Sequence, residues 1–264
     1  MLTWQAALHR ATVELLDMRG TRVESYLLPR AADDGAGPQG AGVCLADLNR
    51  DGWSELVVAS ADSVDLLARA RGAAQTRLAW RFRARAAVAG LHSDEDSGGG
   101  TRIAVSAEDG NLYVLEQDGS LAWRYSAPGP AQSLASGDLD GDGSNELLLA
   151  YNAPAASDGA IHSGVTALRQ DGRAMWSCPF SQRVRSVSVV ELDGAPPAEV
   201  LVVTAGGWVQ ALGGAGQPLW STDIAGAAPL VMPVDVERDG RSGLLAGSED
   251  GRVRLLSPIG QVLW

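Results

Sequence analysis

Residues 119–123 read GSLAW, and the same spacing of glycine and tryptophan returns as GRAMW at 172–176, GQPLW at 216–220 and GQVLW at 260–264. A fifth tryptophan, Trp80, closes TRLAW, where the glycine lies farther back. These five tryptophans are 43, 53, 44 and 44 residues apart along the chain. A nearly constant period of this size indicates that one structural unit is repeated.

An acidic segment recurs in register with the tryptophans. Its two fullest copies are DLNRDGWSEL at 47–56 and DLDGDGSNEL at 138–147, and weaker copies begin at Asp94, Glu191 and Asp235. The three weaker copies begin 29 residues before a tryptophan, and insertions account for the longer distances in the two full copies. Because all five copies keep one register, chance is a poor explanation for them.

Each repeat contains four short apolar runs. In the repeat that contains 138–147, AQSLASG leads into the acidic segment, ELLLAY leaves it, and two further runs follow glycine-containing turns. Short apolar runs between such turns predict β-strands, and no sustained helical period competes with them. A period of 40–45 residues with four strands per unit predicts a β-propeller, whose blades pack face to face around an axis.

The N-terminal segment fits only part of the repeat. Residues 2–28 supply strands two, three and four of a blade but have no first strand and no acidic segment. We therefore predict an all-β, six-bladed β-propeller in a single domain, with five complete four-stranded blades and a partial N-terminal blade. The predicted blades span residues 1–38, 39–82, 83–126, 127–180, 181–223 and 224–264. A longer parent protein with seven blades is the alternative.

The repeated tryptophans are predicted to serve packing rather than ligand contact. A large flat ring at the end of each outer strand fills the gap between neighbouring blades. Burial of ~200 Å² at ~25 cal/mol per Å² stabilises the fold by several kcal/mol per ring as an upper bound.

Composition and charge exclude some classes of function. The 264 residues carry a net charge of −11, whereas nucleic-acid-binding surfaces are basic. The sequence contains no run of about 18 apolar residues, which a membrane span would need. With neither nucleic acid nor a membrane span expected, the expected partner is another protein. The two cysteines, Cys44 and Cys178, are expected to be buried free thiols, and one disulfide between them is the alternative. The N-terminal residues do not resemble a signal peptide, which favours an intracellular protein if the chain is complete and a surface protein if it is a fragment of a secreted chain.

The two fullest acidic segments are candidate calcium loops. They place oxygen-bearing side chains at positions 1, 3 and 5, glycine at position 6 and glutamate at position 9, so that alternate side chains can converge on one ion. The candidate ligands, with the main-chain carbonyl at position 7, are Asp138, Asp140, Asp142, Ser144 and Glu146 in one segment and Asp47, Asn49, Asp51, Trp53 and Glu55 in the other. An EF-hand is excluded, because its position 12 holds Leu149 and Val58 here instead of glutamate.

These loops and the blade period resemble the FG-GAP/VCBS repeats of integrin α-chain propellers and of many bacterial surface proteins. In that family a DxDxDGxxD/E loop joins the first two strands of a blade and often holds calcium. The resemblance therefore implies a propeller with calcium-stabilised hairpins. Glutamate at position 9 leaves a second role open, in which it braces backbone N–H groups of the loop. A third reading is that the aspartates cap turn amides without any ion.

The weaker acidic segments depart from the motif. A third calcium site is doubtful; it would use Asp235, Glu237 and Asp239. Its position 9 is glycine and its position 7 is Arg241. The segments that begin at Glu191 and Asp94 have no oxygen ligand at position 5, so we expect both to be empty.

A binding face is expected at the opposite end of the blades. It comprises the loops between second and third strands and the links between blades, and its candidate anchors are Trp208, Tyr125, Phe180 and His162. Such rings either contact a partner or fold over a blade edge. The basic run RFRAR at 81–85 either lies on a solvated strand edge or contacts an acidic partner.

No catalytic motif is recognisable, and an enzyme is not expected. The three histidines lie in different repeats, and no nucleophile elbow or phosphate-binding loop is present. We therefore predict a non-catalytic protein-interaction or scaffold propeller, similar to those of the BBSome, where DxDGDGxxEL loops occur. The alternative is an extracellular adhesion or carbohydrate-binding module of a longer surface protein. A quinoprotein-like enzyme is a more distant alternative, because the EDG…G…W half of each blade resembles quinoprotein repeats in its strand pattern.

Overall fold

The computed structural model describes residues 2–5, 10–16, 19–27, 42–68, 76–95, 100–153, 163–226, 230–235 and 242–264. Within these residues the chain forms strands, turns and extended segments, and it forms no helix. The strands assemble into six antiparallel sheets, each built from consecutive segments of the chain. A meander of this kind follows directly from short strands joined by tight turns.

The sheets are numbered here in chain order. Sheet 1 contains β1 (Leu2–Gln5), β2 (Arg10–Leu16) and β3 (Arg22–Leu27). Sheet 2 contains β4 (Gly42–Ala46), β5 (Glu55–Ser60), β6 (Ser63–Ala68) and β7 (Arg77–Arg83). Sheet 3 contains β8 (Val88–Glu95), β9 (Thr101–Ala107), β10 (Asn111–Leu115) and β11 (Leu121–Ser126).

The C-terminal half continues the same order. Sheet 4 contains β12 (Ala131–Gly137), β13 (Glu146–Asn152), β14 (Ser163–Leu168) and β15 (Ala174–Phe180). Sheet 5 contains β16 (Val184–Val190), β17 (Glu199–Thr204), β18 (Trp208–Leu212) and β19 (Pro218–Asp223). Sheet 6 contains β20 (Leu230–Val234), β21 (Gly243–Gly247) and β22 (Val253–Leu256).

Sheet 6 has a fourth, short edge segment at the end of the chain. Val262 bridges Leu256, the Leu263 N–H donates to the Leu255 carbonyl over 2.8 Å, and the Leu255 N–H donates to the Trp264 carbonyl over 3.0 Å. Sheets 2 to 6 therefore each have four strand segments, and sheet 1 has three. This agrees with the predicted five complete blades and one partial blade.

A shared irregularity aligns sheets 1 to 5. In sheets 2 to 5 the ladder between the third and fourth strands shifts register next to the tryptophan, for example between Ala211 and Leu212 opposite Trp220. Sheet 1 shows the same shift between Leu15 and Leu16, in the ladder of β2 with β3. Strands β1, β2 and β3 therefore correspond to the second, third and fourth strands of the other sheets.

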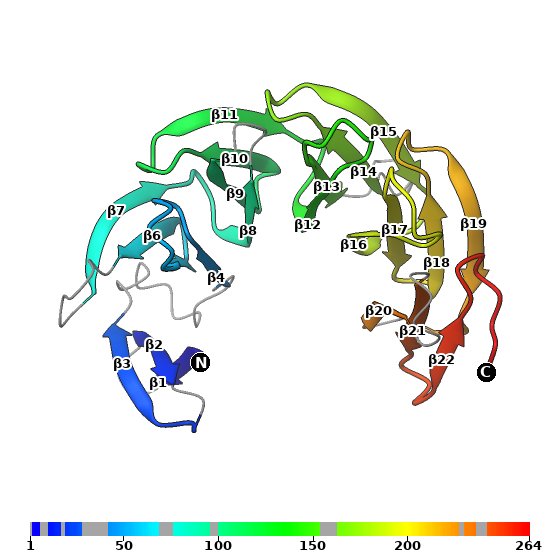
Figure 1. Cartoon of the computed structure of the whole chain (residues 1–264), viewed down its shortest axis with the longest axis horizontal. Coiled ribbons are helices and arrows are strands. Elements are labelled where there is room, and N and C mark those ends of the chain that lie inside the picture. Colours follow the sequence, from blue (N-terminus) through cyan, green and yellow to red (C-terminus); the bar gives the residue numbers. More distant parts are fainter. Residues whose placement is uncertain are drawn as a thin grey trace.

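The sheets follow one another around an open arc (Figure 1). In each complete sheet the first strand lies on the inner side of the arc and the fourth on the outer side. Sheets 1 and 6 lie at the two ends of the arc and do not meet.

The core consists of layers between consecutive sheets. One cluster joins sheets 2 and 3 around Val57, Val105 and Tyr113, and further clusters join sheets 3 and 4, 4 and 5, and 5 and 6. The middle strands are covered on both faces, so β13 and β17 are buried along their whole length. This explains why ELLLAY and EVLVVT read as continuous apolar runs instead of alternating ones.

The tryptophans occupy the joints between sheets, as predicted. Each of four indole N–H groups donates to a carbonyl in the hairpin turn between the third and fourth strands of the next sheet. The pairs are Trp80 with Gln117 at 2.9 Å, Trp123 with Gln170 at 2.7 Å, Trp176 with Gly214 at 2.8 Å and Trp220 with Pro258 at 2.9 Å. Two residues after each carbonyl, a glycine with φ near +80° lies against the ring, where a Cβ would come within less than 3.0 Å of it. Each glycine-to-tryptophan segment therefore takes part in two contacts: its glycine receives the ring of the preceding sheet, and its tryptophan packs on the glycine of the next.

Trp264 departs from the packing prediction. Its side chain is 64% exposed, because the described part of the chain places no further sheet against sheet 6. Within the described residues, Trp264 therefore does not make the contact with a following glycine turn that the four other tryptophans make.

Candidate metal-binding hairpins and interaction face

Three acidic hairpins are built on the same internal brace. In each, the glutamate at position 9 is buried at the start of the second strand, and its Oε2 accepts the backbone N–H of a buried leucine at position 2. The pairs are Glu55 with Leu48 at 2.8 Å, Glu146 with Leu139 at 3.0 Å and Glu199 with Leu192 at 2.9 Å. The three leucines are 1–3% exposed, so each hairpin is fixed to the core by an apolar side chain and a charge-assisted hydrogen bond.

The aspartates of the sheet 4 hairpin cap its turn. The two carboxylate oxygens of Asp138 accept the N–H groups of Gly141 at 2.7 Å and Gly143 at 2.9 Å. Asp142 accepts the N–H of Ser144 at 2.8 Å. Both glycines have φ near +80°, a conformation that costs glycine little. Capping of turn amides by aspartate is therefore present, as one of the open readings expected.

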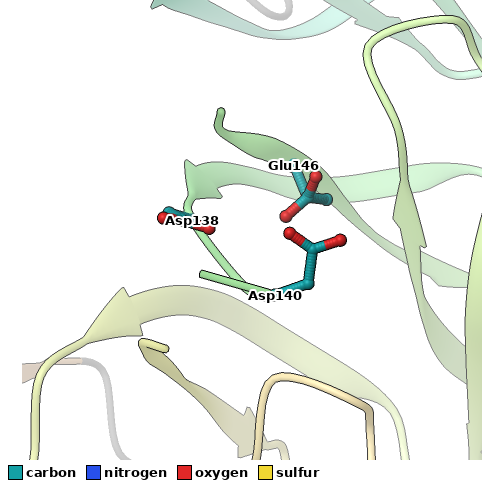
Figure 2. Close-up of side chains that lie close together, drawn as sticks. All are labelled: Asp138, Asp140 and Glu146. Atoms are coloured by element: carbon teal, nitrogen blue, oxygen red, sulfur yellow. The ribbon is translucent and has the colours of Figure 1, made fainter. Parts of the chain in front are cut away.

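Three carboxylates also converge in this hairpin. Oxygens of Asp138, Asp140 and Glu146 all lie within 4.8 Å of one another, and Figure 2 shows the carboxylates of Asp140 and Glu146 pointing toward each other. Arg169, on the turn after β14, lies 3.0 Å from Asp140. This donor set has the carboxylate chemistry that calcium prefers, whereas the Arg169 guanidinium pairs with Asp140 and competes with a cation for that carboxylate.

The electrostatics of Glu146 reflect this crowding. Burial raises the pKa of Glu146 above its usual value, and Asp140 and Asp142 raise it further, while the Leu139 N–H and Arg169 oppose the shift. A raised pKa means that the ionised form of the carboxyl group is disfavoured, and a nearby cation stabilises that ionised form.

Among the side chains at positions 1, 3, 5 and 9, the sheet 2 hairpin differs from that of sheet 4 only at position 3. Asn49 replaces the acid at position 3, and its Nδ2 donates to Glu55 Oε1 over 2.8 Å. Asp47 caps the N–H of Gly52 at 2.9 Å, and Asp51 caps that of Trp53 at 2.9 Å. Both oxygens of Glu55 accept protein hydrogen bonds, and the described residues form no carboxylate cluster here. The calcium site predicted for this hairpin stays a prediction.

A second carboxylate cluster lies where the sequence suggested an empty loop. Glu191, Asp193 and Glu199 bring carboxylate oxygens within 4.8 Å of one another. Burial raises the pKa of Glu199, and Asp193 and Glu191 raise it further, against the Leu192 N–H. These residues occupy positions 1, 3 and 9, as Asp138, Asp140 and Glu146 do, and that spacing is the signal that could have identified them.

The doubtful third calcium segment cannot be placed as a whole. Asp235 is exposed directly after β20. Glu237 and Asp239 lie outside the described residues.

The expected interaction face lies at the other end of the sheets. Main-chain hydrogen bonds tie the turns between second and third strands to the links that leave the fourth strands. Examples are Ala84 N–H to Asp62 carbonyl at 2.7 Å, Ala127 N–H to Gly110 carbonyl at 2.8 Å and Ile224 N–H to Gly207 carbonyl at 2.9 Å. Trp208 begins β18 directly after such a turn and is 38% exposed.

The other candidate anchors of this face are placed differently. Tyr125 is half-buried against the cluster between sheets 3 and 4, and Phe180 is half-buried against the cluster between sheets 4 and 5. His162 lies outside the described residues. Trp53, which the sequence assigned only as a carbonyl ligand, is 64% exposed on an acidic hairpin.

His92 and the first arginine of the basic run have structural partners, and the two cysteines do not form a disulfide. His92 Nε2 lies 2.8 Å from Ser136 Oγ in the next sheet, and burial lowers the pKa of His92 although Asp94 opposes the shift. Burial raises the pKa of the Cys44 thiol to about 11. Both cysteines are free, as predicted, but they are only partly buried. In the basic run, Arg81 forms a bidentate pair with Asp65 at 2.6 and 2.7 Å. No helix in the described residues is long and apolar enough to span a membrane.

Comparison with known proteins identifies the architecture. No family model matches the chain, and none of the curated proteins matches it in sequence. Among solved structures, the propeller of Dos1 superposes with a TM-score of 0.68 and 11% identity, over 96% of this chain and 64% of that one. The chain is a β-propeller.

Two further propeller neighbours were solved together with another protein. BBS1 in complex with ARL6 matches with a TM-score of 0.60 and 15% identity, over 93% of this chain and 74% of that one. Sqt1 of Chaetomium thermophilum, bound to the N-terminus of ribosomal protein L10, matches with a TM-score of 0.61 and 13% identity, over 97% of this chain and 68% of that one. At these identities the likeness establishes the fold. The propeller spans about two thirds to three quarters of the length of these neighbours.

Proposed function

We propose that this propeller is a non-catalytic protein-interaction module whose acidic hairpins are stabilised by calcium. Similar propellers bind ARL6 and a segment of ribosomal protein L10, which supports a protein as the partner. The net charge of −11 argues against nucleic acid.

The observation that carries the interaction role is the rigid end formed by the second-to-third-strand turns and the inter-sheet links. Its backbone is fixed by main-chain hydrogen bonds, so binding there requires little ordering of the chain. Trp208 stands 38% exposed on this end, and exposed tryptophans on rigid supports are frequent hot spots of protein interfaces.

The test compares two tryptophans at opposite ends of the sheets. Proteins cross-linked to the full chain in cells are quantified for the native chain, Trp208→Ala and Trp53→Ala. A partner that is retained by Trp53→Ala and lost by Trp208→Ala supports the proposal. Equal partner sets for all three chains, or loss with Trp53→Ala alone, contradict it.

For the hairpins, we propose calcium at Asp138, Asp140 and Glu146, as the resemblance to FG-GAP/VCBS repeats implies. The convergence of three carboxylates supports this assignment, and so does the glycine turn that gathers them. When bound, the ion would supply positive charge that offsets the repulsion among these carboxylates. The chain itself holds the hairpin in place through Leu139 and the brace by Glu146.

Calcium binding is tested by thermal unfolding in calcium and in EDTA. We expect calcium to raise the melting temperature of the native chain and Asp140→Ala to remove part of the difference. Asp109→Ala is the control, because Asp109 caps a turn at the opposite end of sheet 3. An identical melting temperature in calcium and EDTA for a metal-stripped sample refutes the proposal.

The absence of catalysis is proposed on the state of the reactive groups. A thiol with a pKa of about 11, such as Cys44, is protonated at neutral pH and is a poor nucleophile. His92 is engaged by Ser136 inside a joint between sheets. These contacts support a structural role for both residues.

A further inference from the structure

A pocket lies in the joint between sheets 3 and 4, at the end of the sheets that carries the acidic hairpins. It encloses about 310 Å³, counted out to its open mouth. Sheet 3 forms one wall with residues of all four of its strands, and sheet 4 forms the other. The apolar part of the pocket consists of Ala104, Val114, Trp123 and Leu147. Its polar rim consists of Asp94, Arg102, Asn145 and Gln170.

The space arises from small side chains in one row of sheet 3. In sheets 2 to 5 a row of cross-strand partners runs from the tryptophan through the third strand to the second. The second-strand member of this row is Val57, Leu148 or Leu201 in sheets 2, 4 and 5, but it is Ala104 in sheet 3. Sheets 4 and 5 combine their leucine with an alanine on the third strand, and sheet 2 combines its valine with a leucine. Sheet 3 combines its alanine with Val114, so its row has the least side-chain volume of the four.

The charges on the rim of the pocket are already paired. The Arg102 guanidinium lies 3.0 Å from Glu116 and donates to the Gln170 carbonyl over 3.3 Å. Asp94, the direct cross-strand partner of Arg102, accepts the side-chain N–H of Asn145 at 3.0 Å. A charged ligand would lose its hydration and would meet both a carboxylate and a guanidinium that have partners. The pocket therefore suits an uncharged ligand.

The rim also offers a hydrogen-bond acceptor. The Asp94 carboxylate accepts only from the NH₂ group of an amide, so it fixes the orientation of the Asn145 side chain. The Asn145 Nδ2 is thus engaged, whereas no described residue donates to the Asn145 Oδ1. A hydroxyl group on a ligand can donate to this oxygen.

The shape of the pocket favours a flat ring. Two packed sheets lie about 10 Å apart, so the space left by one short row between them is a slot. The Trp123 indole lines this slot, and its N–H is held by the Gln170 carbonyl at 2.7 Å. An aromatic ring that enters the slot can stack on the indole or meet its edge.

We propose that this pocket binds a phenol group, an uncharged aromatic ring that carries one hydroxyl. The ring lies among Val114, Trp123 and Leu147, and the hydroxyl donates to the Asn145 Oδ1. A tyrosine side chain of another protein and a free phenolic small molecule both supply this chemistry. The pocket lies at the opposite end of the sheets from Trp208, so this site is separate from the proposed interaction face and does not depend on it.

The first test is a titration of the full chain with p-cresol, which is the side chain of tyrosine. The Trp123 indole N–H signal in the ¹⁵N NMR spectrum reports on the pocket. We expect a saturable shift with a Kd on the order of 1 mM, the scale for so small a ligand. 4-Methylbenzoate and 4-methylbenzylammonium keep the ring but add a charge, and we expect each to bind roughly tenfold more weakly.

A substitution that restores the repeat tests the place of binding. Ala104→Leu gives sheet 3 the leucine that sheets 4 and 5 have and fills the pocket, so we expect it to abolish the saturable shift without lowering the melting temperature. Ala89→Leu is the matched control, because it makes the same change at an exposed position of β8, and it should bind p-cresol as the native chain does.

A second variant tests the hydrogen bond and keeps the proposal testable if Ala104→Leu does not fold. 4-Methylanisole keeps the ring but has no hydroxyl donor. We expect the native chain to prefer p-cresol over 4-methylanisole about fivefold, as one hydrogen bond allows, and Asn145→Ala to lose this preference.

N-acetyltyrosinamide distinguishes the two sources of the phenol. Binding of both N-acetyltyrosinamide and p-cresol supports a tyrosine of another protein as the ligand, whereas binding of p-cresol alone supports a free phenol. Three outcomes overturn the proposal: no saturable shift with p-cresol up to about 20 mM, a shift that is unchanged in Ala104→Leu, or charged analogues that bind as tightly as p-cresol.

Discussion

The residue that organises each acidic hairpin is the glutamate at position 9. In the sheet 2 hairpin Glu55 is 4% exposed, and its two oxygens accept the Leu48 N–H and the Asn49 side-chain amide. A buried carboxylate is tolerated because it is hydrogen-bonded. Glutamate reaches the leucine N–H from the start of the second strand, which gives this side chain a structural role in the hairpin.

Replacement of Glu55 tests this brace. We expect Glu55→Ala to lower the free energy of unfolding by about 1–3 kcal/mol, because the buried Leu48 N–H loses its acceptor. Urea unfolding in EDTA measures the change without any contribution from metal. Glu108→Ala, at an exposed turn, should stay within about 0.5 kcal/mol of the native chain; equal losses for both variants would show that the brace contributes nothing specific.

At the scale of elements, the joint between sheets is the repeated unit of stability. A turn glycine, a carbonyl two residues before it and an indole from the preceding sheet form one contact, as Gly216, Gly214 and Trp176 do. The glycine is required twice, once by its positive φ and once by the ring that lies against it. The spacing Gly-x-x-x-Trp arises because each fourth strand takes part in two joints. The glycine in the turn before the strand receives the indole of the preceding sheet, and the tryptophan of the strand packs on the next sheet.

Two glycine substitutions separate these requirements. Gly216→Ala places a Cβ 2.7 Å from the Trp176 ring at a φ of +82°, whereas Gly251→Ala meets nothing within 4 Å at a φ of +79°. We expect Gly251→Ala to cost about 1 kcal/mol from backbone strain alone and Gly216→Ala to cost about 1–3 kcal/mol more, because the ring must shift. Urea unfolding of both variants measures the difference, and equal losses would mean that the ring adjusts freely.

At the scale of the whole molecule, cohesion comes from contacts between consecutive sheets. Besides the core layers, His92 of sheet 3 and Ser136 of sheet 4 hydrogen-bond across one such interface. The folded pKa of His92 is lowered by burial, so the unfolded chain binds more protons just below the ordinary histidine pKa of about 6.5. Stability contributed by neutral His92 is therefore present above about pH 6.5 and is lost as the pH falls below it.

This linkage predicts a pH dependence of melting. Between about pH 7 and pH 5 the melting temperature of the native chain should fall more than that of His92→Gln, which keeps a hydrogen-bonding side chain without the titration. The raised pKa values of Glu146 and Glu199 act in the opposite direction and are common to both chains, so the comparison isolates His92. Parallel pH profiles would assign the dependence to other groups.

The sequence by itself determined the repeat, the strands and the form of the turns. Short apolar runs, aspartates at hairpins and glycines at positive φ depend on interactions between neighbouring residues, so GSLAW and DLDGDGSNEL predicted the same local structures wherever they recur. The packing of four tryptophans was also predictable, because a ring repeated once per blade has to meet the next blade.

Only the tertiary structure decided which side chains of these turns and strands contact one another and which are left exposed. It pairs Asn49 with Glu55 and gathers Glu191, Asp193 and Glu199 into a carboxylate cluster. It packs Tyr125 and Phe180 against the core and leaves Trp264 exposed at the end of an open arc. These outcomes depend on where side chains converge and on which sheets meet, and such contacts join segments that no local pattern relates.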